Sequence, residues 1–369
     1  MLAGAGHAHL QVLQRAGELR TAGVEPILVA PPEFHYSGLA TAVLSGALPP
    51  SRASLNVSAL AARCGVRHVP AEITGVDRSA RRLSLSDGQE LSYDAVSFNV
   101  GSVIDFPGDP EGDRATWPVK PLHRLLALRS EVETRIREGG GSPAIVVAGG
   151  GPTGFEVAAA LAGLCERHGL RPDIHLLRRS SPDWAPPAAL ARLSSALERR
   201  GVIMVDGGAV GQSAETCRLA DGRALPCDLL VLATGLTAPP VIAALGLPLS
   251  EDGRLEVGPD LRTMGDPAVF AVGDCAVIAG APRPAAGVFG VRAAPVLVHN
   301  LGALANGSEM RPYAPQSRWL SILDLGDGTG LALRGGLWSQ GRGALALKRW
   351  IDLGFLDGLR AASGEVLED

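Results

Sequence analysis

The 369-residue sequence contains almost no lysine: of its 34 basic residues only Lys120 and Lys348 are lysines, and the others are arginines. Aromatic residues make up only 4% of the chain, and the formal net charge is only −4 at pH 7. These values give no basic footprint for nucleic acid. A low net charge with 46% hydrophobic residues also argues against disorder. At roughly 150 residues per domain, the length predicts two or more domains.

The cysteines form no CxxC or CxxxxC pair. There are five of them, at positions Cys64, Cys165, Cys217, Cys227 and Cys275. An odd number without a framework is typical of a reducing compartment and predicts neither a zinc site nor a redox dithiol. We expect Cys165 and Cys275 to be small, buried apolar residues. His7, His9 and His35 have no metal-ligand spacing, so we expect no metal site.

Long hydrophobic runs are also missing. No uninterrupted apolar stretch reaches about 18 residues, so no membrane-spanning helix is expected. Glycine-rich sequence begins at Gly4, where a signal peptide would need a basic and then an apolar segment. We therefore expect a cytoplasmic protein.

The sequence does contain an internal repeat. Residues 85–101 (LSDGQELSYDAVSFNVG) and 219–235 (LADGRALPCDLLVLATG) share six residues at a constant offset of 134. In both copies an Asp-Gly turn predicts a hairpin, and an apolar strand then ends at a glycine, Gly101 or Gly235. A glycine-rich turn precedes each copy. We interpret the repeat as two copies of one βαβ-plus-meander plan.

The second glycine-rich turn has the complete dinucleotide-binding pattern. A short apolar strand (144–148) precedes Gly149, Gly151 and Gly154, and a helical apolar pattern follows them. In this GxGxxG arrangement the glycines permit a tight turn, a close approach of pyrophosphate, and close packing of the helix on the strand. The helix N-terminus then faces the phosphates.

The first turn is less regular. Gly4 and Gly6 are in place, but His9 stands at the third glycine position, and we expect it to fill the space of the missing glycine. Only Met1 to Ala3 precede the turn, which predicts either a very short first strand or a natural start further upstream. A strand that ends in Gly273 and Asp274 is a further landmark, because an aspartate there can bind a cofactor hydroxyl. Alternatively, Asp274 belongs to an ordinary turn.

Together, the two glycine turns, the Ala-Thr-Gly strand end (233–235) and the late Gly273-Asp274 pair resemble the pyridine nucleotide–disulfide oxidoreductases. Within them the chain resembles the type II NADH dehydrogenase group, in the variant found fused N-terminally to selenophosphate synthetases. Strings similar to that variant are GHAHLQVL (6–13), HYSGL (35–39), YDAVSFNVGS (93–102), WPVKP (117–121), PRPAAGVFGVR (282–292) and LKRWID (347–352).

The resemblance implies an α/β fold with two Rossmann-like dinucleotide-binding domains and a short C-terminal extension. An NAD(P)-binding domain is inserted into an FAD-binding domain. The expected segments are 1–113 (FAD domain, first part), 114–236 (NAD(P) domain), 237–305 (FAD domain, second part) and 306–369 (extension).

For the first fold the resemblance implies FAD at Gly4 and Gly6, with Gly101 near the cofactor and Asp274 at the ribityl chain. The segment from Gly287 and Val288 to Arg292 would open a helix whose positive end faces the flavin. Proline suits only the first turn of a helix, so Pro295 predicts a later helix start.

The second fold would bind NAD(P)H through Gly149, Gly151 and Gly154. Its second strand ends in Arg178 and Arg179, where NADH binding needs an acidic residue and a 2′-phosphate needs arginine. This favours NADPH. The alternative is that both arginines are simply solvated at the start of a loop.

The implied chemistry is hydride transfer from a nicotinamide to the flavin and electron delivery to a second acceptor. Glu156 matches a glutamate at the nicotinamide–flavin contact in related enzymes and could relay protons. Alternatively, it is a helix N-terminal carboxylate. Lys120 could face the flavin or a phosphate, or be an ordinary linker residue.

The missing cysteine pairs argue against disulfide reduction and lower the likelihood of a sulfide:quinone reductase-like activity. A quinone-like small molecule is therefore the expected acceptor, although the segment 287–297 lacks the glutamines of the quinone motif. The alternative is a slow FAD- and NAD(P)-binding redox sensor, or an electron donor to a protein partner.

A stripe of apolar residues at helical spacing lies near the C-terminus, with Lys348, Arg349 and Asp352 between its members. The stripe consists of Leu347, Trp350, Ile351, Phe355 and Leu359. The resemblance implies peripheral contact with the cytoplasmic face of a membrane through this helix. The alternative is a helix that caps the flavin domain.

Overall fold

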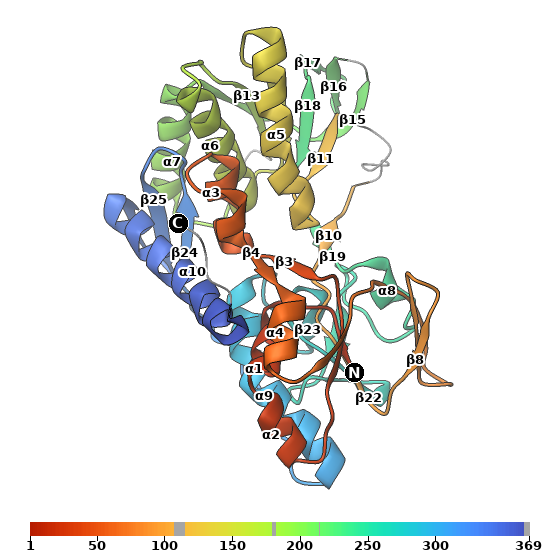
Figure 1. Cartoon of the computed structure of the whole chain (residues 1–369). Coiled ribbons are helices and arrows are strands. Elements are labelled where there is room, and N and C mark those ends of the chain that lie inside the picture. Colours follow the sequence, from red (N-terminus) through yellow and green to blue (C-terminus); the bar gives the residue numbers. More distant parts are fainter. Residues whose placement is uncertain (107–114, 179–181, 214, 365–369) are drawn as a thin grey trace.

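The computed structural model describes residues 1–106, 115–178, 182–213 and 215–364. Two sheets with parallel cores occupy the two halves of the molecule (Figure 1). Arg179 and the domain boundary expected near residue 114 lie outside the described residues.

The first sheet has eight strands in the order β23-β20-β21-β22-β9-β1-β2-β5. The strands are β1 (Leu2–Ala3), β2 (Ile27–Val29), β5 (Arg67–Val69), β9 (Val96–Phe98), β20 (Leu255–Val257), β21 (Arg262–Thr263), β22 (Asp266–Ala271) and β23 (Ala276–Ile278). The short β1 pairs in parallel with both β2 and β9, so two residues suffice to place it centrally in the sheet. Helices α1 (His7–Gln14), α2 (Ala16–Thr21), α4 (Val57–Arg63) and α9 (Gly287–Asn306) contact this half.

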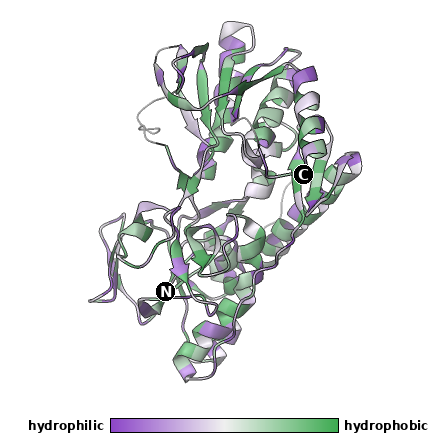
Figure 2. Ribbon diagram, turned by 180° about the vertical axis from the view of Figure 1, so that it is seen from behind, coloured by the Kyte–Doolittle hydropathy of each residue, from purple (hydrophilic) through white to green (hydrophobic). Residues whose placement is uncertain are grey.

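The second sheet has five parallel strands in the order β11-β18-β12-β13-β14. The strands are β11 (Thr116–Pro118), β12 (Ala144–Ala148), β13 (Asp173–Arg178), β14 (Val202–Asp206) and β18 (Leu229–Leu232), and the accompanying helices are α5 (Leu122–Gly139), α6 (Pro152–Arg167) and α7 (Pro187–Arg199). All four residues of β18 are buried, as expected for a strand covered on both faces. The central strands of this sheet are coloured as hydrophobic in Figure 2.

The internal repeat corresponds to two β-meanders of the same plan. Strands β6 (Ile73–Asp77), β7 (Arg82–Leu85) and β8 (Glu90–Ser92) form the first, and β15 (Ala209–Ser213), β16 (Thr216–Leu219) and β17 (Ala224–Pro226) form the second. The predicted Asp-Gly turns lie at equivalent points, with Gly88 at φ +82° and Gly222 at φ +89°. Each meander is followed by a parallel-sheet strand, β9 or β18. The predicted repeat is thus confirmed.

The two halves are linked where the chain passes between them. Strands β10 (Val103–Ile104) and β19 (Leu236–Thr237) pair antiparallel in the middle of the molecule (Figure 1). The remaining short elements are β3 (Glu33–His35), β4 (Ser54–Asn56), α3 (Ser37–Leu44), α8 (Pro240–Ala243) and two 3₁₀ turns, η1 (Pro50–Ala53) and η2 (Gly273–Cys275).

Helix α9 begins at Gly287, so the later start predicted from Pro295 is wrong: Pro295 lies inside the helix. The buried face on both sides of the proline, including Ala293, Ala294 and Leu297, packs in the core and outweighs the one lost backbone hydrogen bond. By length and composition α9 is also the one helix in the described residues that could cross a membrane. More than half of its most apolar window is buried, as in a core helix.

The C-terminal part forms β24 (Ser321–Asp324), β25 (Gly330–Arg334), β26 (Leu337–Gly341) and α10 (Arg342–Ser363). Helix α10 runs along both halves and contacts α4 as well as β25 (Figure 1). Its predicted single stripe is split: Leu359 is buried, whereas Trp350 is 75% exposed. Lys348 and Asp352, which the stripe placed between apolar residues, are buried because they pair with each other.

Candidate functional site

The second glycine turn joins β12 to α6. A Cβ atom on Gly149, whose φ is +143°, would overlap the backbone carbonyl of Ala233 at the end of β18, and a Cβ on Gly154 would overlap the carbonyl of Gly149. In contrast, a Cβ on Gly151 would meet nothing within 4 Å. The first and third glycines therefore allow tight packing, and the second leaves open space for a ligand, as dinucleotide binding requires.

Trp184 covers part of the same turn. Its indole Nε1 donates a hydrogen bond to the Gly150 carbonyl at 2.9 Å, and its ring contacts Phe155 edge to face. Nothing in the sequence pattern predicted this contact, because 34 residues separate the tryptophan from Gly150.

The first glycine turn joins β1 to α1 and packs in the same way against the end of β9. A Cβ on Gly4 (φ +89°) would lie 2.7 Å from the carbonyl oxygen of Asn99. His9 is fully buried at the third position, where its Nδ1 donates to the Gly4 carbonyl at 2.7 Å and its Nε2 accepts from Ser97 Oγ at 2.9 Å. Burial lowers the pKa of His9 to about 4. A neutral imidazole thus fills the space of the missing glycine, as predicted.

Asn99 is a residue that the sequence analysis missed. Its Oδ1 accepts hydrogen bonds from the backbone amides of Ala8 (3.0 Å) and His9 (3.2 Å), and its Nδ2 donates to the Val272 carbonyl at 2.8 Å. The repeat could have indicated it, because Asn99 aligns with Ala233 in the second copy.

Asp274 and Lys120, which lie far apart in sequence, come together. Lys120 Nζ lies 3.9 Å from Asp274 Oδ2, and Ser102 Oγ donates to the same oxygen at 3.3 Å. Asp274 follows Gly273 in η2, directly after β22. A Cβ on Gly101 would meet nothing within 4 Å, so this strand end is open.

The N-terminus of α9 faces α1. A Cβ on Gly287 would lie 3.2 Å from the His7 ring, and His7 also contacts Tyr36, with ring centroids 5.4 Å apart. Burial lowers the pKa of His7 to about 4, although Asp274 acts in the opposite direction. Gly287 therefore lies beside the same segments as Asp274. Val288 is the next residue of α9.

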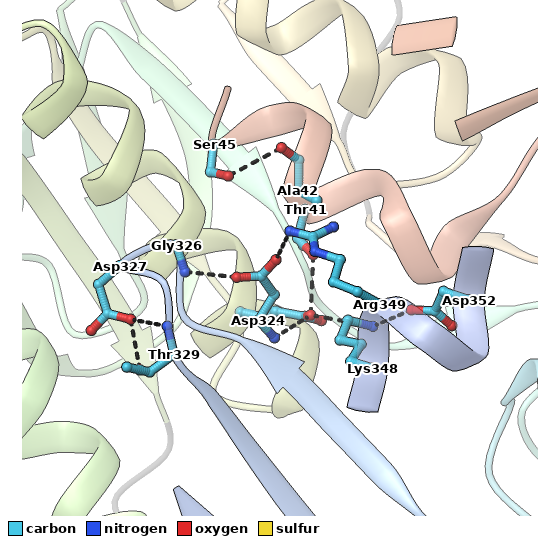
Figure 3. Close-up of polar contacts among 11 residues, drawn as sticks. Thr41, Ala42, Ser45, Asp324, Gly326, Asp327, Thr329, Lys348, Arg349 and Asp352 are labelled. Atoms are coloured by element: carbon cyan, nitrogen blue, oxygen red, sulfur yellow. Dashed lines mark hydrogen bonds and ion pairs between the residues drawn. The ribbon is translucent and has the colours of Figure 1, made fainter. Parts of the chain in front are cut away.

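Glu156 lies in the second turn of α6 and not at its N-terminus, so the alternative of a simple N-terminal carboxylate is wrong. Its Oε1 accepts from the amide of Asp324 (2.8 Å) and from Thr41 Oγ1 (3.1 Å), and it lies 3.9 Å from Lys348 Nζ. These contacts join α6 to α3, β24 and α10, and Figure 3 labels the three partner residues Thr41, Asp324 and Lys348.

Lys348 extends the cluster toward the aromatic residues. Its Nζ lies 3.1 Å from Asp352 Oδ2, and Tyr36 OH donates to Asp352 Oδ1 at 2.9 Å. Figure 3 shows the pair on one face of α10. The chain Glu156–Lys348–Asp352–Tyr36 is therefore continuous, and Tyr36 in turn contacts the His7 ring.

Burial and charge together set the protonation of this cluster. Burial raises the pKa of Glu156, although Lys348 opposes the shift. Burial alone would lower the pKa of Lys348, but the carboxylates of Glu156 and Asp352 raise it above its usual range. The site thus holds a charged lysine beside a carboxyl group that takes up a proton more readily than usual, as a proton-transfer group requires.

Arg178 ends β13, next to the end of β14. Its Nε lies 3.4 Å from Asp206 Oδ1, and the Asp206 side chain is 63% exposed. The guanidinium is therefore paired and not merely solvated, with a partner that solvent can reach. Gly235 follows β18, and a Cβ there would meet nothing within 4 Å.

The thiols bear on sulfur chemistry. Cys165 and Cys275 are fully buried, as predicted, and burial raises the pKa of Cys275 to about 12. Contrary to expectation, two cysteines do meet: Cys217, in β16, interacts with Cys227, the residue after β17. Both are free thiols buried in the apolar cluster with Val146. In the described part of the chain no group of three or more His, Cys, Asp or Glu side chains could hold a metal ion.

The α/β fold thus contains two glycine turns, each packed against a neighbouring strand end. This is the arrangement found in proteins that bind two dinucleotides. The sequence profile described as pyridine nucleotide-disulphide oxidoreductase matches residues 1–300, and the chain belongs to this family. The cofactors of the family are FAD and NAD(P)H. The predicted fold class is thereby confirmed.

Relatives and a solved structure are consistent with this assignment. An NADH dehydrogenase-like protein of Mycobacterium tuberculosis is 30% identical over 224 residues, which cover 58% of this chain and 56% of the relative. A type II NADH:quinone oxidoreductase of the same species is 27% identical over 331 residues, covering 78% and 69%. The match to the first of these spans little more than half of the relative's length. The fold of NDH2 from Plasmodium falciparum, solved with NADH, superposes with a TM-score of 0.81 at 13% identity, covering 98% and 96% of the two chains.

Proposed function

We propose that the protein is an FAD-dependent NAD(P)H:acceptor oxidoreductase whose acceptor is a quinone-like small molecule. The observation that carries the proposal is the pair of glycine turns, each packed against the carbonyl of a strand end. When bound, FAD would supply the two-electron chemistry between the nicotinamide and the acceptor.

We infer that the turn at Gly4 and Gly6, with Gly101, Gly273 and Asp274, holds FAD. A Cβ on Gly4 would overlap backbone, a Cβ on Gly6 or Gly273 would overlap the Asn99 side chain, and Gly101 opens into space, so this sheet edge has the close packing and the free space that a dinucleotide needs. Lys120 supports the assignment because it brings a positive charge to Asp274. The N-terminus of α9, at Gly287 and Val288, would add its positive helix end.

For NAD(P)H we infer Gly149, Gly151, Gly154 and Gly235 as the binding positions and Arg178 as the residue that favours NADPH. An arginine at the end of the second strand accommodates a 2′-phosphate. Asp206 would then exchange its pairing with Arg178 for exposure to water, at little cost for so exposed a carboxylate.

Glu156 is the proposed proton-transfer residue. A two-electron reduction of a quinone-like acceptor takes up protons, and a carboxyl group with a raised pKa can deliver one. Lys348 would hold the carboxylate in place after the proton has left. The acceptor would reach the site along the exposed face of α10 that carries Trp350 and Ile351.

The same helix supports peripheral membrane contact on the cytoplasmic face. Leu347, Trp350 and Ile351 are at least 40% exposed, and Leu337 of β26 is 77% exposed. Exposed apolar residues with tryptophan among them are typical of helices that lie in the membrane interface. We also infer that the chain is a relative of the flavoprotein variant fused to selenophosphate synthetases, which the strings HYSGL and WPVKP support.

The test is the absorption spectrum of the purified protein, followed by anaerobic titration with NADPH and NADH. A flavin spectrum that is bleached, preferentially by NADPH, supports the proposal. Absence of reduction by both nucleotides in FAD-loaded protein contradicts it. Steady-state reduction of a soluble quinone then separates the enzyme from a sensor, which would form a charge-transfer complex without turnover.

A further inference from the structure

The two glycine turns differ at one buried side chain. In the second copy of the repeat the strand end carries Ala233, and the space beside Gly151 is open. In the first copy the same position carries Asn99, and a Cβ on Gly6 would overlap its side-chain amide. The first turn therefore contains a polar group that the second turn lacks.

The Asn99 side chain is only 4% exposed and makes three hydrogen bonds. It accepts from the amides of Ala8 and His9 in the first turn of α1, and it donates to the carbonyl of Val272 just before Gly273. A Cβ on Gly273 would also overlap its Nδ2. Asn99 thus ties the glycine turn, the start of α1 and the segment that leads to Asp274 to one another.

These bonds satisfy amides that a helix N-terminus otherwise leaves unpaired. The N-cap residue of both helices is a glycine without a side chain, Gly6 in α1 and Gly151 in α6. In α6, however, the first residue is Pro152, which has no N–H, and no side chain of the described residues takes the place that Asn99 has at α1. The first turn is therefore held in its shape by the protein itself, whereas the second is complete only when a ligand or water takes its amides.

We propose that Asn99 is a positioning residue for FAD, which pre-organises the first turn so that this dinucleotide stays resident while the second turn exchanges its nucleotide. A site that is already ordered loses less conformational entropy when its ligand binds, and the ligand is therefore held more tightly. The inference rests on the proposed function in one respect, namely that FAD occupies the first turn.

The experiment compares Asn99→Ala with Asn56→Ala in the full chain. Asn56 caps the N-terminus of α4 through its bond to the Ala59 amide, so its removal is a matched loss of a helix cap in the same half of the molecule. FAD release from the loaded protein is followed by fluorescence recovery after dilution, and the Kd for NADPH is measured in parallel.

For Asn99→Ala we expect FAD to dissociate about tenfold faster and to bind about tenfold more weakly, with the NADPH Kd unchanged. Asn56→Ala should lower the melting temperature without changing the binding of FAD or of NADPH. FAD binding within about twofold of wild type, tighter FAD binding, or an equal loss of FAD and NADPH would overturn the proposal.

Asn99→Asp serves as the second variant if Asn99→Ala does not fold. Its carboxylate still accepts from the two amides of α1 but cannot donate to the Val272 carbonyl, and it places a negative charge beside the turn that would hold the FAD diphosphate. We expect weaker FAD binding here too, and wild-type affinity would contradict the proposal. If the wild-type protein itself fails to bind FAD, the cofactor assignment and this inference are both overturned. If the wild type binds FAD but the variants do not show the expected loss of FAD binding, only this inference is overturned.

Discussion

At the scale of single residues, the carboxyl group of Glu156 carries the clearest chemical consequence. Its raised pKa and its three contacts, to Thr41, Asp324 and Lys348, suit a group that gives up a proton and is then held as an anion. The arginine-rich composition makes the contact with Lys348 notable, because the chain has only one other lysine.

Replacing Glu156 with glutamine should lower the rate of acceptor reduction about 10²-fold, since general acid catalysis is lost. In the wild type, the rate should fall as the pH rises through the raised pKa of Glu156, because only the protonated form can donate. The variant should lack this pH dependence. Stopped-flow reoxidation by a quinone measures both. Glu166→Gln, on the exposed side of the same helix, is the control and should behave like wild type.

The guanidinium of Arg178 leads to a second prediction. Arg178→Ala should raise the KM for NADPH about tenfold and leave the KM for NADH nearly unchanged, because only NADPH has a 2′-phosphate. Steady-state kinetics with both nucleotides measures the ratio. Arg223→Ala, an exposed arginine in the β16–β17 turn, is the control. An equal change in the KM values for NADPH and NADH would show that Arg178 does not recognise the 2′-phosphate.

At the scale of elements, two glycines allow the hairpin of β24 and β25 to pack closely on α6. A Cβ on Gly163, in the middle of α6, would overlap the carbonyl of Gly326, and a Cβ on Gly326 (φ +67°) would lie 2.5 Å from the carbonyl of Ala159. This close contact brings β24 and α10 to Glu156. The sequence showed glycine in a helix but not what required it.

Gly163→Ala should therefore destabilise the protein by about 1–3 kcal/mol, as overpacking does, and should lower acceptor reduction with it. Thermal unfolding measures the first effect. Gly17→Ala is the matched control: its Cβ would meet nothing within 4 Å in α2, so a stabilisation of up to about 1 kcal/mol is expected. A stable Gly163→Ala protein would show that the contact between α6 and the hairpin can relax.

Helix α10 leads to the second prediction at this scale. Trp350→Glu should reduce binding to vesicles that contain anionic phosphatidylglycerol, because it removes an exposed apolar side chain and adds a repelled charge. Co-sedimentation measures the binding. Met264→Glu, which is 68% exposed in the turn between β21 and β22, is the control and should bind as the wild type does. If the wild-type protein does not bind the vesicles, the exposed face of α10 has another partner.

At the scale of the whole molecule, buried histidines link stability to pH. In the fold the pKa of His9 is about 4, below its unfolded value near 6.5, so folding favours the neutral ring. This contribution is complete above pH 6.5 and is lost as the pH falls from 6.5 to about 4. His7 acts in the same direction.

We expect the free energy of unfolding to fall by roughly 3 kcal/mol across that window on account of His9. Urea titrations at a series of pH values measure it. His9→Gln should flatten the pH dependence, whereas His299→Gln, at a half-buried histidine that bonds the Glu309 carbonyl, should retain it. An unchanged slope in His9→Gln would show that His9 is not the source.

The sequence by itself determined the two sheets, the repeated meanders and the second glycine turn. Those features depend on neighbours in the chain: an apolar run followed by GxGxxG folds as strand, turn and helix wherever it stands. The strand ends at Gly101 and Gly235 follow from the same local rule. The family resemblance supplied Asp274 and Glu156 as candidates, because their positions relative to these motifs can be read along the chain.

Only the tertiary structure decided what each candidate touches. The contact of Lys348 with Glu156 joins residues 192 positions apart, and that of Asn99 with Val272 spans 173 positions. Such pairings depend on how α6 and α10 both pack against β24 and how β22 lies beside β9, which no local pattern encodes. The later start of α9 that Pro295 suggested was wrong for the same reason, since burial against the first sheet overrides the local preference of Pro295, and the helix begins at Gly287 as the resemblance implied.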